Sequence, residues 1–290
     1  MLKIAFIINP ISGKGKGNLV PNLIEKYLDK SRFNSEIVFT QYGGHGKELA
    51  SSFVQQNYDI VVAVGGDGTM NEVASSVANT NTALAIIPLG SGNGLARFHG
   101  YSLNPKKAIQ QLNQGKFYTS DYGVIDGNQD FFCTCGIGYD AFVSQRFAEQ
   151  SSRGLKTYLK VIFESFFSYK PLIYKLSGDK FNCEEKAFLI TFANANQWGN
   201  NAYVDPDAVI DDGLMEISIL TEFPKWEIPI LVYQLFTKKI NKNPYVKIYQ
   251  TNSVTVSREE SGPFHFDGES FPKEKEIKIE IIHNKLKIFK

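Results

Sequence analysis

Two glycine-rich stretches of the chain carry the residue types that bind phosphate groups. In the first, a short apolar run over residues 61–64 leads directly into Gly-Gly-Asp-Gly-Thr, and a helical pattern follows. Backbone N–H groups beside glycines approach an oxyanion closely, and the start of a helix adds positive potential. A tight turn alone would explain the paired glycines but not the Asp, Gly and Thr after them, so we interpret the stretch as a phosphate site. The candidate contacts are Gly65, Gly66, Asp67, Gly68, Thr69, Met70 and Asn71.

The second glycine-rich stretch repeats this arrangement. Residues 83–89 form another short apolar run, and Gly-Ser-Gly-Asn follows at 90–93. Loops after neighbouring parallel strands lie side by side at the carboxyl edge of the sheet, where ligands bind in open α/β folds. Neither stretch has the G-x-G-x-x-G dinucleotide fingerprint, because Leu95 stands in place of its third glycine, and the chain has no P-loop motif. This loop adds Ser91, Gly92 and Asn93 as candidate contacts.

Two acidic stretches in the second half could supply the carboxylates that phosphoryl transfer needs. Residues 205–214 mix aspartates with turn residues, which is typical of a site for a hard cation but equally of a solvated acidic turn. Residues 264–269 place Asp267 and Glu269 on either side of a glycine, directly after an aromatic strand pattern. A sharp turn at that glycine would deliver one carboxylate to a binding site.

The elements that must position these residues change character along the chain. Up to about residue 120, strand patterns at 3–9, 36–40, 61–64 and 83–89 alternate with helical patterns, which indicates a parallel sheet with helices on both faces. Beyond Asp121, strand patterns dominate, with hairpin turns predicted at 177–179 and 283–285 and helices at 153–167 and 225–240. The second half is therefore predicted to be mainly antiparallel β-structure.

Composition excludes several classes of protein. The chain has 290 residues with 31 basic and 30 acidic side chains, so it lacks the basic surplus of a nucleic-acid binder. Three cysteines suit a reducing compartment, and Cys133 and Cys135 are predicted to pack in the core rather than bind metal. No apolar run approaches the roughly 20 residues of a membrane helix, and the apolar start is too short for a signal peptide. We expect a cytoplasmic protein with no nucleic-acid partner.

The paired motifs resemble the diacylglycerol kinase catalytic family. The residues that carry the resemblance are Gly-Gly-Asp-Gly-Thr at 65–69 with Asn71 and Glu72, together with Pro-Leu-Gly-Ser-Gly-Asn at 88–93. That family includes bacterial diacylglycerol kinases, sphingosine kinases and ceramide kinases, and the similarity continues along nearly the whole chain. It implies an α/β nucleotide-binding domain over residues 1–122, which residues 286–290 can return to complete. It also implies a β-sandwich domain over residues 123–285 that binds the lipid and a metal ion, with the active site in the cleft.

The resemblance implies an ATP-dependent kinase that phosphorylates a lipid hydroxyl with Mg²⁺. The family has an Asn-Pro-x-Ser-Gly loop after the first strand and a nucleotide-contacting threonine after the second. A solvated linker would resemble the first of these loops, but its position after a strand makes triphosphate contacts plausible. Carried over to this chain, these contacts are Asn9, Ser12, Gly13, Lys14 and Thr40.

The family also implies roles for the acidic stretches. In related bacterial enzymes a structural Mg²⁺ binds an Asp and nearby carbonyl groups, which correspond here to Asp212 and the carbonyls of Val209 and Leu214. In the bacterial branch the Glu of Asp-Gly-Glu, here Glu269, is the general base. In the sphingosine-kinase branch this role belongs to Asp67. We favour Glu269 as the base and Asp67 as the organiser of the nucleotide–metal site.

The lipid itself is left open by the sequence. Gly94 replaces the Asp that usually follows Asn93 in diacylglycerol kinases, and Asp140 stands near the acid that binds an amino-alcohol headgroup in sphingosine kinases. Both features favour a long-chain base slightly over diacylglycerol. The alternatives are a kinase of a soluble substrate, as in NAD kinases, and a nucleotide-binding regulator without activity. The expected partners are the lipid, transiently the inner membrane face, and a second copy of the chain in a homodimer.

Overall fold

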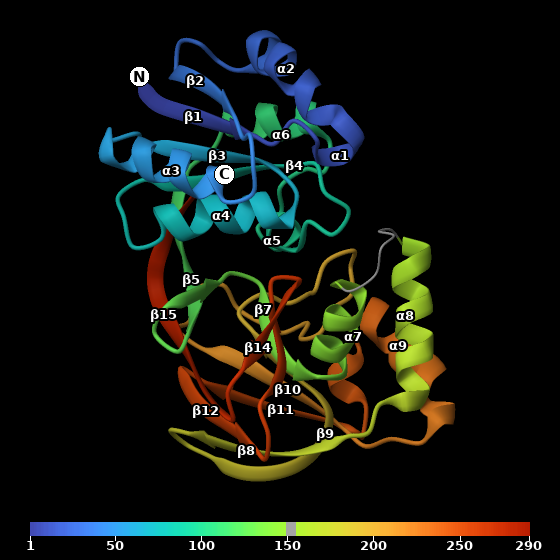
Figure 1. Cartoon of the computed structure of the whole chain (residues 1–290). Helices are drawn as coiled ribbons and strands as arrows, with labels where there is room; N and C mark the ends of the chain where they lie inside the picture. Colours follow the sequence, from blue (N-terminus) through green and yellow to red (C-terminus); the bar gives the residue numbers. More distant parts are fainter. Residues whose placement is uncertain (149–154) are drawn as a thin grey trace. The chain divides into compact units, whose positions relative to one another are not determined.

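The computed structural model describes residues 1–148 and 155–290 (Figure 1). Packing divides the chain into two compact units. The first contains residues 1–122, 210–212 and 282–290, and the second contains residues 123–209 and 213–281. Two strands, β5 (Phe117–Ile125) and β15 (Glu276–Phe289), contribute residues to both units.

The first unit is built on a parallel sheet. Its strands are β1 (Leu2–Ile8), β2 (Phe33–Phe39), β3 (Ile60–Gly65) and β4 (Ala83–Pro88), in the order β4-β3-β1-β2. Every residue of β3 and β4 is buried, as expected for central strands covered on both faces. The end of β15 lies beside β4, with Ile288 paired to Leu84. The predicted parallel sheet is confirmed.

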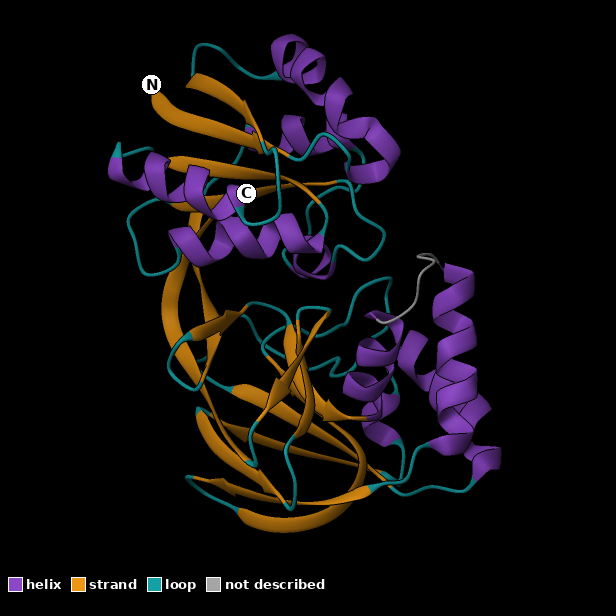
Figure 2. Cartoon of the chain, in the orientation of Figure 1, coloured by secondary structure: helices purple, strands orange, loops and turns teal. Residues whose placement is uncertain are grey.

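Helices cover both faces of this sheet (Figure 2). One pair is α3 (His45–Gln55) with α4 (Asp67–Val77), and the other is α2 (Val20–Tyr27) with α6 (Pro105–Leu112). Buried apolar side chains of α4, among them Val73 and Val77, form the face that packs on the strands. The short segments of this unit are α1 (Ser12–Gly15), η1 (Lys16–Leu19) and α5 (Gly94–Phe98).

The second unit is antiparallel in every strand pair described. The strand order is β14-β13-β7-β9-β8-β12-β15, and β10 pairs with β9 and β11. Alternate residues of these strands build one apolar core that includes Ile190, Phe192 and Phe264. The strands are β6 (Gln129–Phe131), β7 (Thr134–Gly138), β8 (Leu172–Gly178), β9 (Asn182–Ala193), β10 (Met215–Thr221), β11 (Val246–Thr251), β12 (Ser253–Arg258), β13 (Gly262–Phe266) and β14 (Glu269–Lys273).

The helices of the second unit lie outside its strands (Figure 1). They are α7 (Tyr139–Ala148), α8 (Leu155–Ser168), η2 (Lys225–Glu227), α9 (Ile228–Phe236) and η3 (Ile240–Lys242). The helix predicted over 225–240 is therefore one short α-helix between two 3₁₀ turns. The start of the other predicted helix, residues 153–154, falls outside the described residues. Cys133 and Cys135 are buried, so their prediction as core residues is confirmed.

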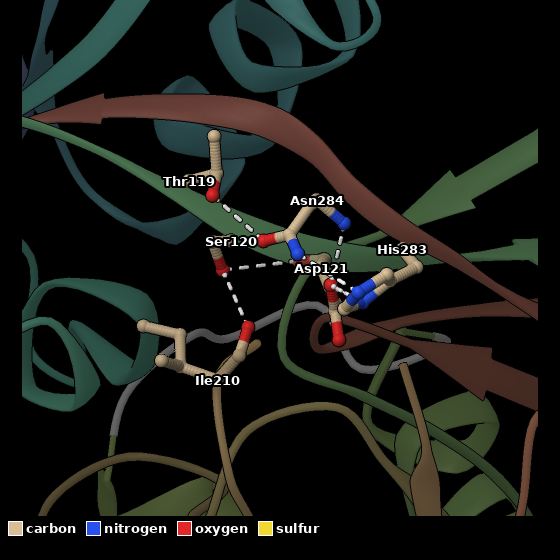
Figure 3. Close-up of polar contacts among 6 residues, drawn as sticks. All are labelled: Thr119, Ser120, Asp121, Ile210, His283 and Asn284. Carbon is tan, nitrogen blue, oxygen red and sulfur yellow. Dashed lines mark hydrogen bonds and ion pairs between the residues drawn. The ribbon is translucent and has the colours of Figure 1, made fainter. Parts of the chain in front are cut away.

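One predicted turn is wrong. The hairpin at 177–179 does join β8 to β9, but residues 283–285 lie inside the continuous strand β15. Asn284 has the left-handed conformation (φ 55°) that favours turns, yet here the chain continues as a strand. Its neighbours explain why. The Asp121 carboxylate accepts hydrogen bonds from the Asn284 N–H at 2.6 Å and from His283 Nδ1 at 3.0 Å (Figure 3).

The same network explains why the boundary between the two units differs from the one predicted from sequence. The Asp121 N–H donates to the Ile210 carbonyl at 2.8 Å, and the Ser120 hydroxyl donates to it at 3.3 Å (Figure 3). Residues 210–212 therefore belong to the first unit, although the sequence prediction assigned them to the second domain. For β15, the segment that returns to the first unit begins at residue 282 rather than 286, because it is already fixed to Asp121 at His283.

Candidate active site

Four loops of the first unit follow the carboxyl ends of parallel strands. They connect β1 to α1, β2 to α3, β3 to α4, and β4 to α5. Because β4, β3, β1 and β2 are neighbours in the sheet, these loops share one edge. The residues predicted from the sequence to contact a nucleotide lie in these loops, at the ends of the strands or in the first turns of the helices that follow.

Asp67 joins the two glycine-rich loops. Its Oδ2 accepts the Asn93 N–H and its Oδ1 accepts the Gly94 N–H, both at 2.9 Å. Hydrogen bonds to a carboxylate are about twice as strong as neutral ones, so this bridge fixes the second loop to the start of α4. The sequence put Asp67 at a polar strand end but did not predict this partner.

Glycine is required where the two loops meet. A Cβ on Gly90 would lie 2.7 Å from the Gly66 Cα, and one on Gly92 would lie 2.9 Å from the Asp67 Oδ2. The Leu89 N–H also donates to the Gly65 carbonyl at 2.7 Å. A side chain at Gly90 would push the two loops apart, and one at Gly92 would displace the Asp67 carboxylate that joins them.

The start of α4 is suited to an anion. Gly66 is the N-cap residue, has extended backbone angles and supplies no side chain to cap the first turn. Gly68 is exposed on that turn. Unsatisfied N–H groups and the positive end of the helix favour a phosphate at this position. Among the predicted contacts Met70 fits least, because its side chain is buried and its N–H already donates to the Gly66 carbonyl.

The loop after β1 packs against both glycine-rich loops. The Asn9 amide donates to the Thr69 hydroxyl at 3.3 Å, and a Cβ on Gly13 would lie 2.9 Å from the Leu89 carbonyl oxygen. Gly13, Lys14 and Gly15 are all left-handed, with φ values of 60°, 60° and 87°. Turns that pass from right-handed to left-handed residues direct successive N–H groups to one side and form concavities that bind anions, and this loop makes that change between Ile11 and Gly13. Lys14, which is exposed, adds a positive charge there.

The loop after β2 is attached to α4 by Glu72. The Glu72 carboxylate accepts the Gly44 N–H at 2.8 Å and the Gly46 N–H at 2.9 Å. The Thr40 N–H donates to the Ile8 carbonyl at 2.9 Å, which places this threonine at the same sheet edge. Glu72 is part of the motif that carries the family resemblance, but the sequence does not predict a role for it. Its acceptance of the Gly44 and Gly46 N–H groups at the start of α3 is a tertiary contact without a local signal.

In the second unit, Asp267 organises the turn that carries Glu269. Asp267 and Gly268 form a two-residue hairpin loop with φ values of 47° and 90°, the geometry for which Asp-Gly is favoured. The Asp267 carboxylate accepts the N–H groups of Phe132, Cys133 and Thr134 at 2.8, 2.8 and 3.2 Å. Glu269 follows at the start of β14 and is exposed.

Asp140 has a partner that the sequence did not predict. Its Oδ2 lies 2.6 Å from His265 Nε2, and the histidine is 5% exposed. A Cβ on Gly136 would lie 2.8 Å from His265 Nε2 and 3.1 Å from the Asp140 Oδ2, so a glycine is needed beside this pair. The carboxylate predicted to bind a headgroup is therefore already paired.

The predicted metal ligands lie in the turn that precedes β10. Val209 and Asp212 are exposed, and Gly213 is left-handed with φ 75°. Among the described residues, no group of three or more His, Cys, Asp or Glu side chains is arranged to hold a metal ion. The predicted set has one carboxylate and two carbonyls. An all-oxygen set of this kind fits a hard cation such as Mg²⁺ rather than a transition metal.

Comparison with known proteins assigns the family. The diacylglycerol kinase catalytic domain matches residues 3–125, and the YegS C-terminal NAD kinase beta sandwich-like domain matches residues 133–290. The chain therefore belongs to the diacylglycerol kinase catalytic-domain family, and its class is that of a lipid kinase. Within that family it belongs to the proteins that carry a YegS-type β-sandwich after the catalytic domain.

Individual proteins support this assignment. A "probable lipid kinase YegS-like" protein of Serratia proteamaculans (strain 568) is 26% identical over 286 residues, covering 94% of this chain and 90% of its own length. Its counterpart in Yersinia pestis (strain Pestoides F) is 26% identical and covers 89% and 88%. The crystal structure of a diacylglycerol kinase from Bacillus anthracis str. Sterne has a TM-score of 0.75 at 20% identity, with 99% and 96% coverage. A second structure from that strain reaches 0.81 at 21% identity, with 99% and 94% coverage, so the fold is the same.

Proposed function

We propose that this protein transfers the γ-phosphoryl group of ATP to a hydroxyl group of a lipid. The observation that carries the proposal is the Asp67 bridge between the two glycine-rich loops. It holds two sets of backbone N–H groups at the sheet edge where phosphates bind in α/β folds. The names of the relatives, lipid kinase and diacylglycerol kinase, agree with a lipid acceptor.

In this proposal the first unit binds the nucleotide. The start of α4 and the left-handed residues 13–15 receive the triphosphate, and Lys14 compensates its charge. Glu72 keeps the Thr40 loop beside them. Phosphoryl transfer depends mainly on positioning and charge stabilisation, which rigid backbone donors supply.

Magnesium has two proposed places. At the nucleotide, Asp67 supports the site, and a bound Mg²⁺ would neutralise charge on the phosphates. At the turn before β10, Asp212 with the carbonyls of Val209 and Leu214 would hold a second, structural ion. The latter role is tested by melting the protein across a Mg²⁺ titration, with Asp212→Asn as the comparison.

Glu269 is the proposed general base. Asp267 fixes the hairpin through three backbone N–H groups, so the backbone that carries the exposed Glu269 side chain is held in place. A carboxylate held in this way can accept the proton of the lipid hydroxyl as the phosphoryl group is transferred. The role requires the acceptor hydroxyl to meet both Glu269 and the γ-phosphate in the reacting complex.

For the lipid class, Asp140 is the relevant residue. Asp140 directs Oδ2 at the buried His265 and accepts the Ala141 N–H with Oδ1 at 2.8 Å, so protein groups already compensate the charge that would attract an ammonium headgroup. We therefore propose a neutral headgroup, such as that of diacylglycerol, over the long-chain base that Gly94 and Asp140 favoured by sequence.

The test is a screen of the purified protein with γ-labelled ATP and a panel of dispersed lipids, followed by extraction and chromatography. The panel contains diacylglycerol, monoacylglycerol, sphingosine and ceramide, with NAD as a soluble acceptor. Label in diacylglycerol supports the proposal. Label in sphingosine alone would overturn the headgroup argument, and label only in NAD would replace the lipid by a soluble substrate. If ATP binds without transfer to any acceptor, the protein is a nucleotide-binding regulator.

A further inference from the structure

The segment around α9 exposes an unusual number of large apolar side chains. The nine residues of α9 include one strongly polar side chain, Gln234, and only Leu231 is buried. The helix and the turn before it expose Trp226, Ile230, Val232, Tyr233 and Phe236 by 67%, 41%, 50%, 59% and 52%. Contiguous exposed apolar groups of this kind mark contact surfaces rather than ordinary protein surface. We call these five residues the α9 surface.

Four lysines flank the α9 surface, and they are all exposed: Lys225, Lys238, Lys239 and Lys242. The only acidic residue between residues 223 and 246 is Glu227, which is 4% exposed and accepts a hydrogen bond from the Asn243 amide at 2.8 Å. Glu222 pairs with Lys186, and Asp207 accepts a hydrogen bond from Asn241. The apolar face therefore has a cationic border.

The composition of the α9 surface matches an anionic membrane. Trp and Tyr are enriched where protein meets the headgroup layer, and lysines beside them are attracted to anionic lipids. No helix among residues 1–148 and 155–290 is long and apolar enough to cross a membrane, and α9, at about 1.5 Å per residue, is far too short. Its geometry fits a helix that lies in the interface.

We propose that the α9 surface docks the protein on an anionic lipid bilayer, with the five apolar side chains inserted among the headgroups and the four lysines facing anionic lipids. This inference rests on the proposed function, because an enzyme acting on a membrane lipid must reach it at a bilayer. It adds which helix makes the contact and which lipid charge is preferred.

The test measures binding to vesicles without ATP or substrate, so its outcome is independent of the kinase assay. Wild-type protein is sedimented with two kinds of vesicle. One is pure phosphatidylcholine, and in the other phosphatidylglycerol replaces a quarter of the lipid. We expect binding to the anionic vesicles that weakens with added salt. The double variant Val232→Ser/Phe236→Ser should bind at least tenfold more weakly, and Lys238→Glu/Lys239→Glu should lose the preference for phosphatidylglycerol.

Matched controls come from the first unit. Leu103→Ser replaces a 43%-exposed leucine, and Lys106→Glu/Lys107→Glu replaces two exposed lysines of α6. These variants should bind vesicles like the wild type. Melting temperatures close to the wild-type value show that each variant is folded, as expected for exposed positions.

A spectroscopic measurement locates the contact directly. The chain has two tryptophans, so Trp198→Phe leaves Trp226 as the single reporter. Brominated acyl chains should quench its emission in anionic vesicles. The proposal is overturned if the wild type does not bind vesicles, if the α9 and control variants bind equally, or if Trp226 is not quenched. It is also overturned if the α9 variants change only the oligomeric state, because the face would then contact a second copy.

Discussion

The Asp67 carboxylate accepts the backbone N–H of Asn93 at 2.9 Å, across a separation of 26 residues in the chain. A second bond of equal length goes to Gly94. Asp67 belongs to the first glycine-rich loop by its motif. Through these two bonds it also determines the position of the second loop. The proposed nucleotide site therefore depends on both loops, and changing Asp67 affects them together.

The substitution Asp67→Asn removes the negative charge of the side chain while nearly keeping its shape. The amide keeps one acceptor oxygen and loses the other, so one bond to the second loop is lost. A hydrogen bond to a charged group contributes about 1.5–3 kcal/mol, and we expect a loss of stability in that range with a weaker affinity for ATP. Thermal melting and ATP titration measure both effects. Unchanged melting together with normal ATP affinity would contradict the bridging role.

Glu72→Gln tests the connection between α4 and the loop after β2. The carboxylate accepts the Gly44 N–H with one oxygen and the Gly46 N–H with the other, whereas glutamine would place an NH₂ group against one of these two donors. We expect the variant to expose that loop to amide hydrogen exchange and to raise the KM for ATP several-fold, with the rest of the sheet protected as before. If protection at residues 40–46 stays at the wild-type level, Glu72 does not hold the loop.

These relationships show what the sequence could and could not provide. The buried runs of β3 and β4 and the glycine loops after them are local patterns, and they predicted the sheet, its edge and the candidate nucleotide contacts. Partners such as Asp140 with His265, or Asp121 with His283, are 125 and 162 residues apart and have no periodic signal. The wrong turn at 283–285 has the same cause. A left-handed asparagine favours a turn, and the chain continues as a strand here because His283 and Asn284 are bound to Asp121, which is distant in the sequence.

Asp267→Asn tests the support of Glu269. Three backbone N–H groups converge on the Asp267 carboxylate, and the hairpin residue itself is left-handed. We expect the variant to be less stable by about 1.5–3 kcal/mol and to have a lower kcat, because the backbone that carries Glu269 is no longer held in place. ATP affinity should be retained, since the proposed nucleotide contacts belong to the other unit. A variant with wild-type kcat would mean that the hairpin needs no carboxylate.

The buried His99 should make the free energy of unfolding depend on pH. Burial, with a smaller contribution from the Lys290 charge, lowers the pKa of His99 from 6.5 to about 3. Because the unfolded chain binds this proton near pH 6.5 while the folded one does not, the contribution to stability is full above that pH. It is lost progressively as the pH falls from about 6.5 toward 3.

The variant His99→Gln removes this titration while keeping a polar partner for the Tyr118 hydroxyl, which lies 3.1 Å from His99 Nδ1. We expect the free energy of unfolding of the variant to fall less steeply than that of the wild type between pH 6.5 and pH 4. Denaturant unfolding at several pH values measures the two slopes. Parallel curves would show that His99 is not held neutral by the fold.

Transfer of γ-labelled phosphate into extracted lipid, compared between the wild type and Glu269→Gln, tests the central claim most directly. The substitution keeps the shape of the side chain and removes its basicity. We predict labelled lipid with the wild type, a kcat lower by roughly 10²–10⁴-fold in the variant, and equal ATP affinity in both. Equal kcat in the two proteins would move the base role to Asp67, and the absence of label in any lipid with the wild type would contradict the proposed function.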